Sequence, residues 1–129
     1  MVCFRNVFPV EVFLLCSASK ARHFPVVVKE RSHVVLCWLK EPGNAKHRNQ
    51  IIEVSKSFQK IPGVLEVRAG QVVSSEREIV DDSFDVAILV IVPDQKRLTE
   101  YLDHPIHQKA KKDALIPLVD KIIVYDFKE

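Results

Sequence analysis

The sequence predicts an α+β domain in which a four-stranded antiparallel sheet carries its helices on one face. Two runs are apolar and rich in β-branched residues, as buried strands are: HVVLCWL over 33–39 and FDVAILVIV over 84–92. Between them, apolar residues recur at steps of three and four, which indicates an amphipathic helix over 45–60. With the elements described below, the order is β-α-β-β-α-β, the ferredoxin-like arrangement.

Turn residues separate the elements of the first half of the chain. Asn44 follows a Pro-Gly pair at 42–43 and is a suitable N-cap for the predicted helix. Ile-Pro-Gly at 61–63 ends that helix, and the mixed run over 64–73 predicts a partly exposed strand. The polar and acidic stretch over 74–83 predicts a loop before the second buried strand.

The second half of the chain completes the pattern. A helix begins after Asp94, His104-Pro105 interrupts it, and a shorter helical piece covers 106–119. The run KIIVYDF over 121–127 predicts the last strand. In this topology the first and third strands, which are the most apolar, occupy the centre of the sheet.

Neither face of the first strand is suited to water. Its alternating side chains form two apolar sets, His33/Val35/Cys37/Leu39 and Val34/Leu36/Trp38. One set meets the helices, so the other requires a second covering. We therefore expect a homodimer whose sheets pack face to face and close an α+β barrel.

Charge and composition exclude several classes of partner. Residues 1–32 contain five Lys or Arg and two Asp or Glu, while the rest of the chain is nearly neutral. Without a one-sided basic field, we expect no nucleic-acid partner. No apolar run reaches the roughly 18–20 residues that span a bilayer, so we expect no membrane partner. With three Gly and no glycine-rich phosphate loop, we expect no nucleotide cofactor, and in fact no cofactor at all.

The cysteines indicate the compartment in which the protein is located. Cys3, Cys16 and Cys37 form no metal-binding or disulfide spacing, so we expect free thiols and a cytoplasmic protein.

Residues 1–30 lie outside the elements of the fold and form an N-terminal extension. Its first 19 residues have the outline of an export signal, which Glu11 weakens. Two other interpretations of this extension remain open: an arm packed on the domain, or a segment without a function.

Several motifs resemble those of the stress-responsive A/B barrel (Dabb) family. The most specific are Tyr-x-x-His-Pro-x-His at 101–107 and Pro-Gly-Val at 62–64, with further matches at 33–36, 84–85 and 124–127. The resemblance covers residues 31–129 and implies a ferredoxin-like subunit whose dimer forms an α+β barrel. The family includes stress-induced plant proteins without an assigned reaction. It also includes a plant polyketide cyclase, olivetolic acid cyclase, to which the chain is distantly similar.

The resemblance to that cyclase implies four site residues: His33, Tyr101, His107 and Asp126. The topology independently places two of them together, because His33 begins the first strand and Asp126 ends its antiparallel neighbour. A carboxylate beside an imidazole fixes its tautomer, as a general base requires. A phenol and a second imidazole would then polarise a carbonyl and move its proton. The sequence departs from the cyclase at Val86, where the cyclase has a further pocket histidine.

The same residues also have structural interpretations. A hydrogen bond from His33 to a buried Asp126 would hold the edge of the barrel. His104 and His107 would cap the broken helix through backbone contacts, and their spacing supplies only two metal ligands, fewer than a zinc site needs. Tyr101 lies on an apolar helix face and would pack in the core.

Two functions therefore remain open. One is a dimeric binding or stress-related module, and the other is a cofactor-free enzyme of the cyclase or isomerase type acting on a carbonyl compound. The expected ligand in either case is a small hydrophobic or aromatic molecule. A cavity open at His33 and His107 would favour the enzyme. A space filled by Leu98, Phe58 and Trp38 would favour the module.

Overall fold

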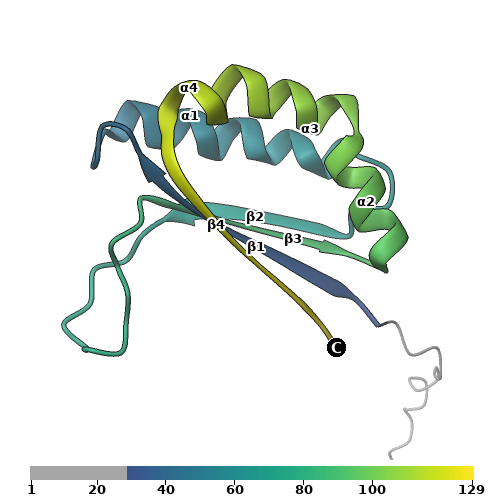
Figure 1. The fold of residues 1–129 in the computed structure, drawn as a ribbon, viewed down its shortest axis with the longest axis horizontal. Helices are drawn as coiled ribbons and strands as arrows, with labels where there is room; N and C mark the ends of the chain where they lie inside the picture. Colours follow the sequence, from purple (N-terminus) through teal and green to yellow (C-terminus); the bar gives the residue numbers. More distant parts are fainter. Residues whose placement is uncertain (1–28) are drawn as a thin grey trace, which may run out of the picture.

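The predicted order of elements is confirmed in a computed structural model, which describes residues 29–129. The helices and strands are β1 (Arg31–Leu39), α1 (Ala45–Lys56), η3 (Ser57–Lys60), β2 (Glu66–Gln71), β3 (Val86–Val92), α2 (Gln95–Asp103), α3 (Pro105–Ala110), η4 (Lys111–Leu115), α4 (Ile116–Leu118) and β4 (Val119–Lys128). The strands form one antiparallel sheet in the order β2-β3-β1-β4, so β1 and β3 are central as expected. All helices cover the same face of the sheet (Figure 1). The proposals for residues 1–28 lie outside the described part of the chain.

Capping residues define where the helices begin. The Asn44 side chain accepts a hydrogen bond from the His47 amide at 3.0 Å, so the predicted N-cap of α1 is confirmed. The Asp94 side chain caps α2 by accepting from the Arg97 amide at 2.9 Å. Gly63, in the turn before β2, has a φ of +90°, and a Cβ there would lie 2.6 Å from the Arg97 side chain. The turn therefore requires glycine for its backbone conformation, and any larger residue would also displace the Arg97 side chain.

A buried carboxylate holds the turn between β1 and α1. One oxygen of Asp85 accepts from the Leu39 amide at 2.9 Å, and the other accepts from the Gly43 amide at 2.8 Å. The Asp85 amide in turn donates to the Cys37 carbonyl at 2.9 Å. These charge-assisted hydrogen bonds offset the cost of burying the carboxylate at the start of β3.

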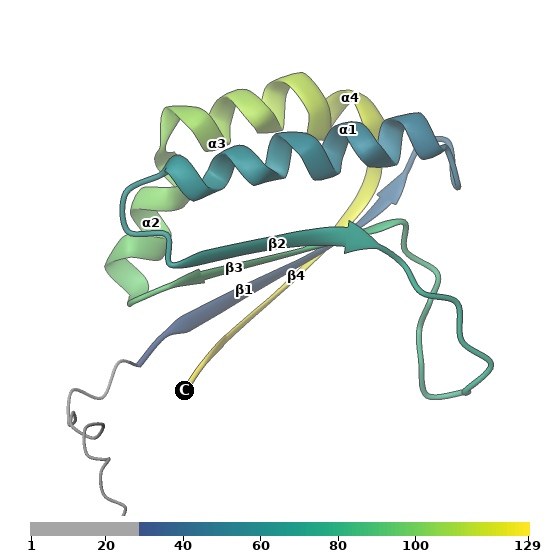
Figure 2. The same cartoon turned by 180° about the vertical axis from the view of Figure 1, so that it is seen from behind.

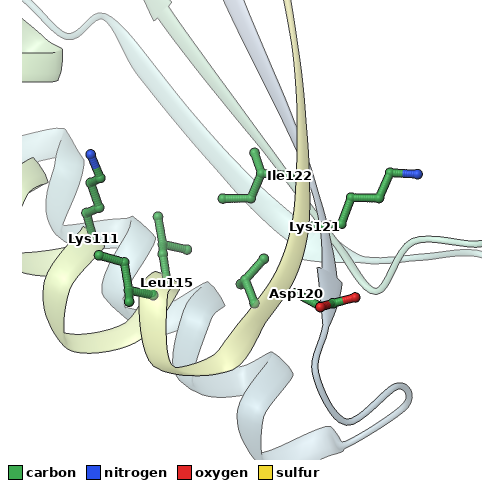
Figure 3. A pocket seen from close by; sticks show the side chains of 7 residues that line it. Lys111, Leu115, Asp120, Lys121 and Ile122 are labelled. Atoms are coloured by element: carbon green, nitrogen blue, oxygen red, sulfur yellow. The ribbon is translucent and has the colours of Figure 1, made fainter.

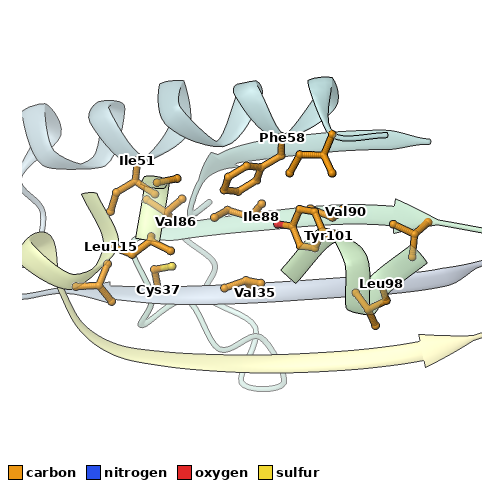
Figure 4. Close-up of a cluster of buried hydrophobic side chains, with 14 of the residues drawn as sticks. Val35, Cys37, Ile51, Phe58, Val86, Ile88, Val90, Leu98, Tyr101 and Leu115 are labelled. Atoms are coloured by element: carbon orange, nitrogen blue, oxygen red, sulfur yellow. The ribbon is translucent and has the colours of Figure 1, made fainter. Parts of the chain in front are cut away.

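The core lies between the sheet and the helices (Figure 4). It contains the helix-facing residues of β1 and β3 together with Ile51, Phe58, Leu98 and Tyr101 from the helical layer. Cys37 is a free thiol within it, and burial raises its pKa to about 11, with a smaller contribution from the charge of Asp85. Cys37 is therefore a protonated packing residue, while Cys3 and Cys16 lie outside the described residues.

The opposite face of the sheet carries no helix, as the view from behind also shows (Figure 2). Apolar side chains continue across it from β1 and β3 to β4, where Tyr125 and Phe127 are 60% and 54% exposed. Trp38 lies on this face: its indole N–H donates to the Ser83 hydroxyl, and the Lys121 ammonium lies 4.5 Å from its ring centre. The alternative in which Trp38 fills the space beneath the helices is therefore wrong, because it belongs to the other alternating set.

No helix among residues 29–129 has the length and apolar character needed to cross a membrane.

Candidate functional site

The break between α2 and α3 positions two of the predicted site residues. His104 ends α2, and its Nδ1 accepts from the Ile106 amide at 3.1 Å, so its predicted capping role is confirmed. Pro105 occupies the first position of α3, where its missing N–H costs nothing. The turn lets Tyr101, before the break, and His107, after it, both face the sheet.

The other two site residues meet across neighbouring strands. His33 and Asp126 are partners in the β1–β4 register, and His33 Nδ1–H donates to Asp126 Oδ1 at 2.5 Å. The cross-strand pairing expected from the topology is therefore confirmed. The imidazole is buried with 6% of its side chain exposed, but the Asp126 side chain is 48% exposed. The expectation of a buried Asp126 is wrong for the chain considered by itself, because β4 is an edge strand and leaves the carboxylate in contact with solvent.

Aromatic contacts join these residues into one cluster. The Tyr101 ring lies 4.8 Å from His107 and 5.9 Å from His33, measured between ring centres. Phe58 meets Tyr101 edge-on at 5.5 Å and His107 at 5.4 Å. Figure 4 shows Phe58 and Tyr101 converging beside Ile88 of β3. Edge-to-face contacts of this kind add rigidity to a site beyond simple apolar burial.

The cluster opens into a cavity of about 190 Å³ between the helices and the sheet. It is lined by His33, Val35, Phe58, Ile88, Tyr101, Leu102, His107, Lys111, Leu115, Ile122 and Val124. His33, Tyr101 and His107 thus face one mostly apolar space, and Asp126 supports His33 from outside it. Leu98 is buried elsewhere in the core, so the space beneath the helices is only partly filled.

The cavity fixes the protonation of Tyr101. Burial raises the pKa of the Tyr101 phenol well above its ordinary value, so the hydroxyl stays neutral at physiological pH. Within residues 29–129 this hydroxyl has no hydrogen-bond partner, although the residue is only 1% exposed. The hydroxyl oxygen does not belong to the fully buried polar atoms without a partner, so it keeps contact with the space of the cavity. The Tyr101 O–H is therefore available to donate to a bound molecule.

His107 is also held in a defined state. Burial is the main reason that its pKa lies below the ordinary value, opposed by the hydrogen bond to the Leu102 carbonyl. Electrostatic repulsion from His33 and Lys111 lowers that pKa further. Nδ1–H donates to the Leu102 carbonyl at 3.0 Å, so the lone pair of the neutral ring is on Nε2. His107 is thus a neutral imidazole with one nitrogen free to accept a proton.

Lys111 and the β4 side of the cavity were missed by sequence reasoning. Lys111 follows His107 by four residues, so it lies on the same helix face. Ile122 and Val124 precede Asp126 by four and two residues, which places all three on one face of β4. Periodicity places these positions on the same faces as the predicted site residues, but it does not show that a cavity lies between those faces.

The described residues offer no evident metal site. Among residues 29–129, no three His, Cys, Asp or Glu side chains come close enough to hold a metal ion together. The polar groups that line the cavity are two imidazoles, a phenol and the ammonium group of a lysine.

Comparison with known proteins identifies a family model and many similar folds. The model of the Stress responsive A/B Barrel Domain family matches residues 32–129. None of the curated proteins matches the chain. Among solved structures, a hydroxynitrile lyase from Passiflora edulis has a TM-score of 0.68 and 21% identity, and the match covers 80% of this chain and 95% of the lyase.

Two further structures show the same architecture. A Dabb family protein from Mesorhizobium loti with a ferredoxin-like fold has a TM-score of 0.63 and 22% identity over 77% of this chain and 95% of its own. A dimeric ferredoxin-like protein of unknown function from Thermobifida fusca has a TM-score of 0.65 and 16% identity over 83% and 99% of the two chains. At these identities the likeness establishes the fold alone.

Proposed function

Because the chain belongs to the stress-responsive A/B barrel domain family, we propose that it binds a small apolar carbonyl compound beneath its helices and moves a proton on that compound without a cofactor. The observation that carries this proposal is the convergence of His33, Tyr101 and His107 on one apolar cavity. A cavity of this kind, with a few convergent polar groups, is the usual form of a small-molecule site.

Each group has a role that its environment supports. His33, oriented by Asp126, accepts the proton from the carbon next to the carbonyl group. The bond electrons move onto the carbonyl oxygen, and the neutral Tyr101 O–H stabilises the resulting enolate by donating a hydrogen bond. His107 Nε2 accepts or relays a proton at a second position. If a double bond is conjugated with the enolate, a proton returned at the far carbon of that system gives an isomerisation. Attack of the enolate carbon on a second carbonyl group of the same molecule, whose oxygen takes the proton, gives a cyclisation.

A binding module without catalysis is the second candidate, and a specific observation favours it. His104 and His107 both hydrogen-bond to backbone groups at the helix break, so part of the motif has a structural use. The similar structures include both possibilities, a hydroxynitrile lyase and proteins of unknown function. The two candidates share the cavity and differ in whether a bound molecule exchanges protons.

We also propose that the chain is a homodimer formed through the helix-free face of its sheet. Apolar side chains of β1, β3 and β4 lie on that face, and those of Tyr125 and Phe127 are exposed to solvent in the single chain. The ion pair of Glu66 and Arg68 on β2 lies at its other edge. A continuous apolar surface of this kind marks an interaction site. The similar Thermobifida fusca protein is dimeric, which supports a dimer here.

Hydrogen–deuterium exchange at carbon tests the proposed reaction without knowledge of the natural substrate. Phenylacetone and similar small aromatic ketones are incubated with the protein in D₂O, and loss of the signal of protons next to the carbonyl is followed by NMR. We expect exchange faster than in buffer, reduced about 10²-fold or more by His33→Gln. His47→Gln, on α1 outside the cavity, is the matched control and leaves the rate unchanged. Binding of the ketones without faster exchange would favour the binding module instead.

A further inference from the structure

We infer that the cavity selects an amphipathic molecule with one negative charge, whose anionic group pairs with Lys111 while its apolar body lies between the helices and the sheet. This inference rests on the proposed function, in that it takes the cavity to be the ligand site. It adds the class of ligand and a residue that determines specificity.

Lys111 lies where two hollows adjoin. The cavity beside His107 shares Lys111, Leu115 and Ile122 with a shallower depression of about 330 Å³ near the start of β4. Figure 3 shows Leu115 between Lys111 on η4 and Ile122 on β4, whereas Lys121 points away from them. Lys111 is the charged group that both of them share, while Asp120 and Lys121 line only the depression.

The charge of Lys111 is not neutralised by the described part of the chain. No carboxylate of residues 29–129 forms an ion pair with it. The neighbouring Lys109 is paired with Asp113 at 2.9 Å, and Lys121 lies over the Trp38 ring on the other face of the sheet. The carboxylate of Asp126 already forms a hydrogen bond with His33. An anion at Lys111 would therefore meet an unpaired positive charge.

Lys111 is exposed to solvent and lies at the edge of the cavity, whose lining is otherwise mostly apolar. Lys111 is one of the groups that disfavour a proton on His107, so its field reaches the imidazole. A carboxylate at the edge of an apolar space interacts more strongly with an ammonium group than it would in bulk water, because the effective dielectric constant is lower. A cationic molecule would be repelled from the same position. A neutral one would gain only from apolar contact.

The inference is tested with two probes that share the same apolar body. 3-Phenylpropanoate carries a carboxylate, and 3-phenylpropan-1-ol carries a hydroxyl group in its place. Binding of each is measured by calorimetry, and the ring-proton NMR signals of His33 and His107 report whether the probe enters the cavity. Lys111→Met removes the charge and keeps the aliphatic stem. Lys112→Met is the matched control, because its side chain is exposed and lines neither hollow.

We expect the carboxylate to bind the unmodified protein more tightly than the alcohol. Lys111→Met weakens binding of the carboxylate about five- to tenfold and leaves binding of the alcohol within twofold, whereas Lys112→Met changes neither. If both probes shift the histidine signals and bind equally in all three proteins, the inference about Lys111 is overturned while the ligand site stands. If neither probe shifts those signals, the proposed ligand site itself fails.

Discussion

His33 and Asp126 face each other across β1 and β4, and a hydrogen bond of 2.5 Å joins the buried imidazole to a carboxylate that is half-exposed. The exposed carboxylate of Asp126 thus orients the His33 imidazole, which lines the cavity. The pair is suited to hold one tautomer of His33, with Nδ1–H directed at the carboxylate and the lone pair on Nε2. Its contribution to stability is limited, because solvent screens the charge of Asp126.

The first prediction separates orientation from stability at this pair. Asp126→Asn keeps an oxygen that accepts from His33 Nδ1–H, but it removes the negative charge that stabilises a protonated His33. We expect the free energy of unfolding to fall by less than about 1 kcal/mol. We expect the rate of ketone proton exchange to fall about two- to fivefold, because the lost contact stabilises a protonated His33 by only about 0.4–1 kcal/mol when solvent screens the carboxylate. Urea denaturation and NMR exchange measure the two effects. A large loss of stability with unchanged exchange would show that the pair is purely structural.

The second prediction concerns the Tyr101 hydroxyl. Because no group of the described residues bonds to it, Tyr101→Phe should leave the melting temperature unchanged or slightly raised. If the hydroxyl stabilises an enolate, the same change lowers the exchange rate by about 10²-fold. The chain offers Tyr125→Phe as a control, since Tyr125 is exposed on the opposite face of the sheet. Equal exchange rates in the two variants would remove Tyr101 from the mechanism.

The third prediction concerns Asp85, which does not line the cavity. Its two oxygens accept from the amides of Leu39 and Gly43, so Asp85→Asn replaces one acceptor with a donor that faces an N–H group. We expect the free energy of unfolding to fall by about 2–3 kcal/mol. Asp120→Asn, at an exposed position of β4, should have little effect in the same denaturation experiment. A small cost at Asp85 would show that water replaces these bonds readily.

The fourth prediction is a pH dependence that arises from His107. Its pKa in the folded protein lies below the ordinary value, which is about 6.5. As the pH falls below that ordinary value, the unfolded chain takes up a proton that the folded chain does not, so stability decreases. The loss continues until the pH reaches the lower, folded-state pKa. Denaturation at several pH values between 5 and 7.5 should therefore show a steeper loss for the unmodified protein than for His107→Gln. Parallel pH profiles for the two proteins would contradict the depressed pKa.

Much of the fold and part of the site could be predicted from the sequence. The alternation of apolar residues in 33–39 and 84–92 identifies the central strands, and strand order then places His33 opposite Asp126. Those inferences depend on backbone periodicity and topology, which a single sequence records. The capping role of His104 was predictable for the same reason, since Pro105 fixes where the second helix segment starts.

The cavity and its edge could not be predicted, because they depend on side-chain volumes rather than on periodicity. Whether Tyr101 fills the core or borders a space is decided by how Phe58 and Leu115 pack around it. The predicted strand order makes β4 an edge strand, but how far solvent reaches the Asp126 carboxylate depends on what covers that edge, which the order alone does not determine. Lys111 reads as an ordinary solvated lysine until the helix is placed over β4.

The last prediction concerns assembly. If two copies meet through the helix-free face of the sheet, light scattering at micromolar concentration should report about twice 14.8 kDa. Leu89→Arg places a charge at the centre of that face, between β1 and β2, and should yield the monomer, because an apolar interface on the order of 2,000 Å² does not accommodate an unpaired guanidinium. Ile79→Arg is the matched control, since Ile79 is 82% exposed in the loop between β2 and β3 and lies off the sheet. A folded, monomeric unmodified protein at that concentration would exclude the proposed dimer, and the apolar face would then need another partner.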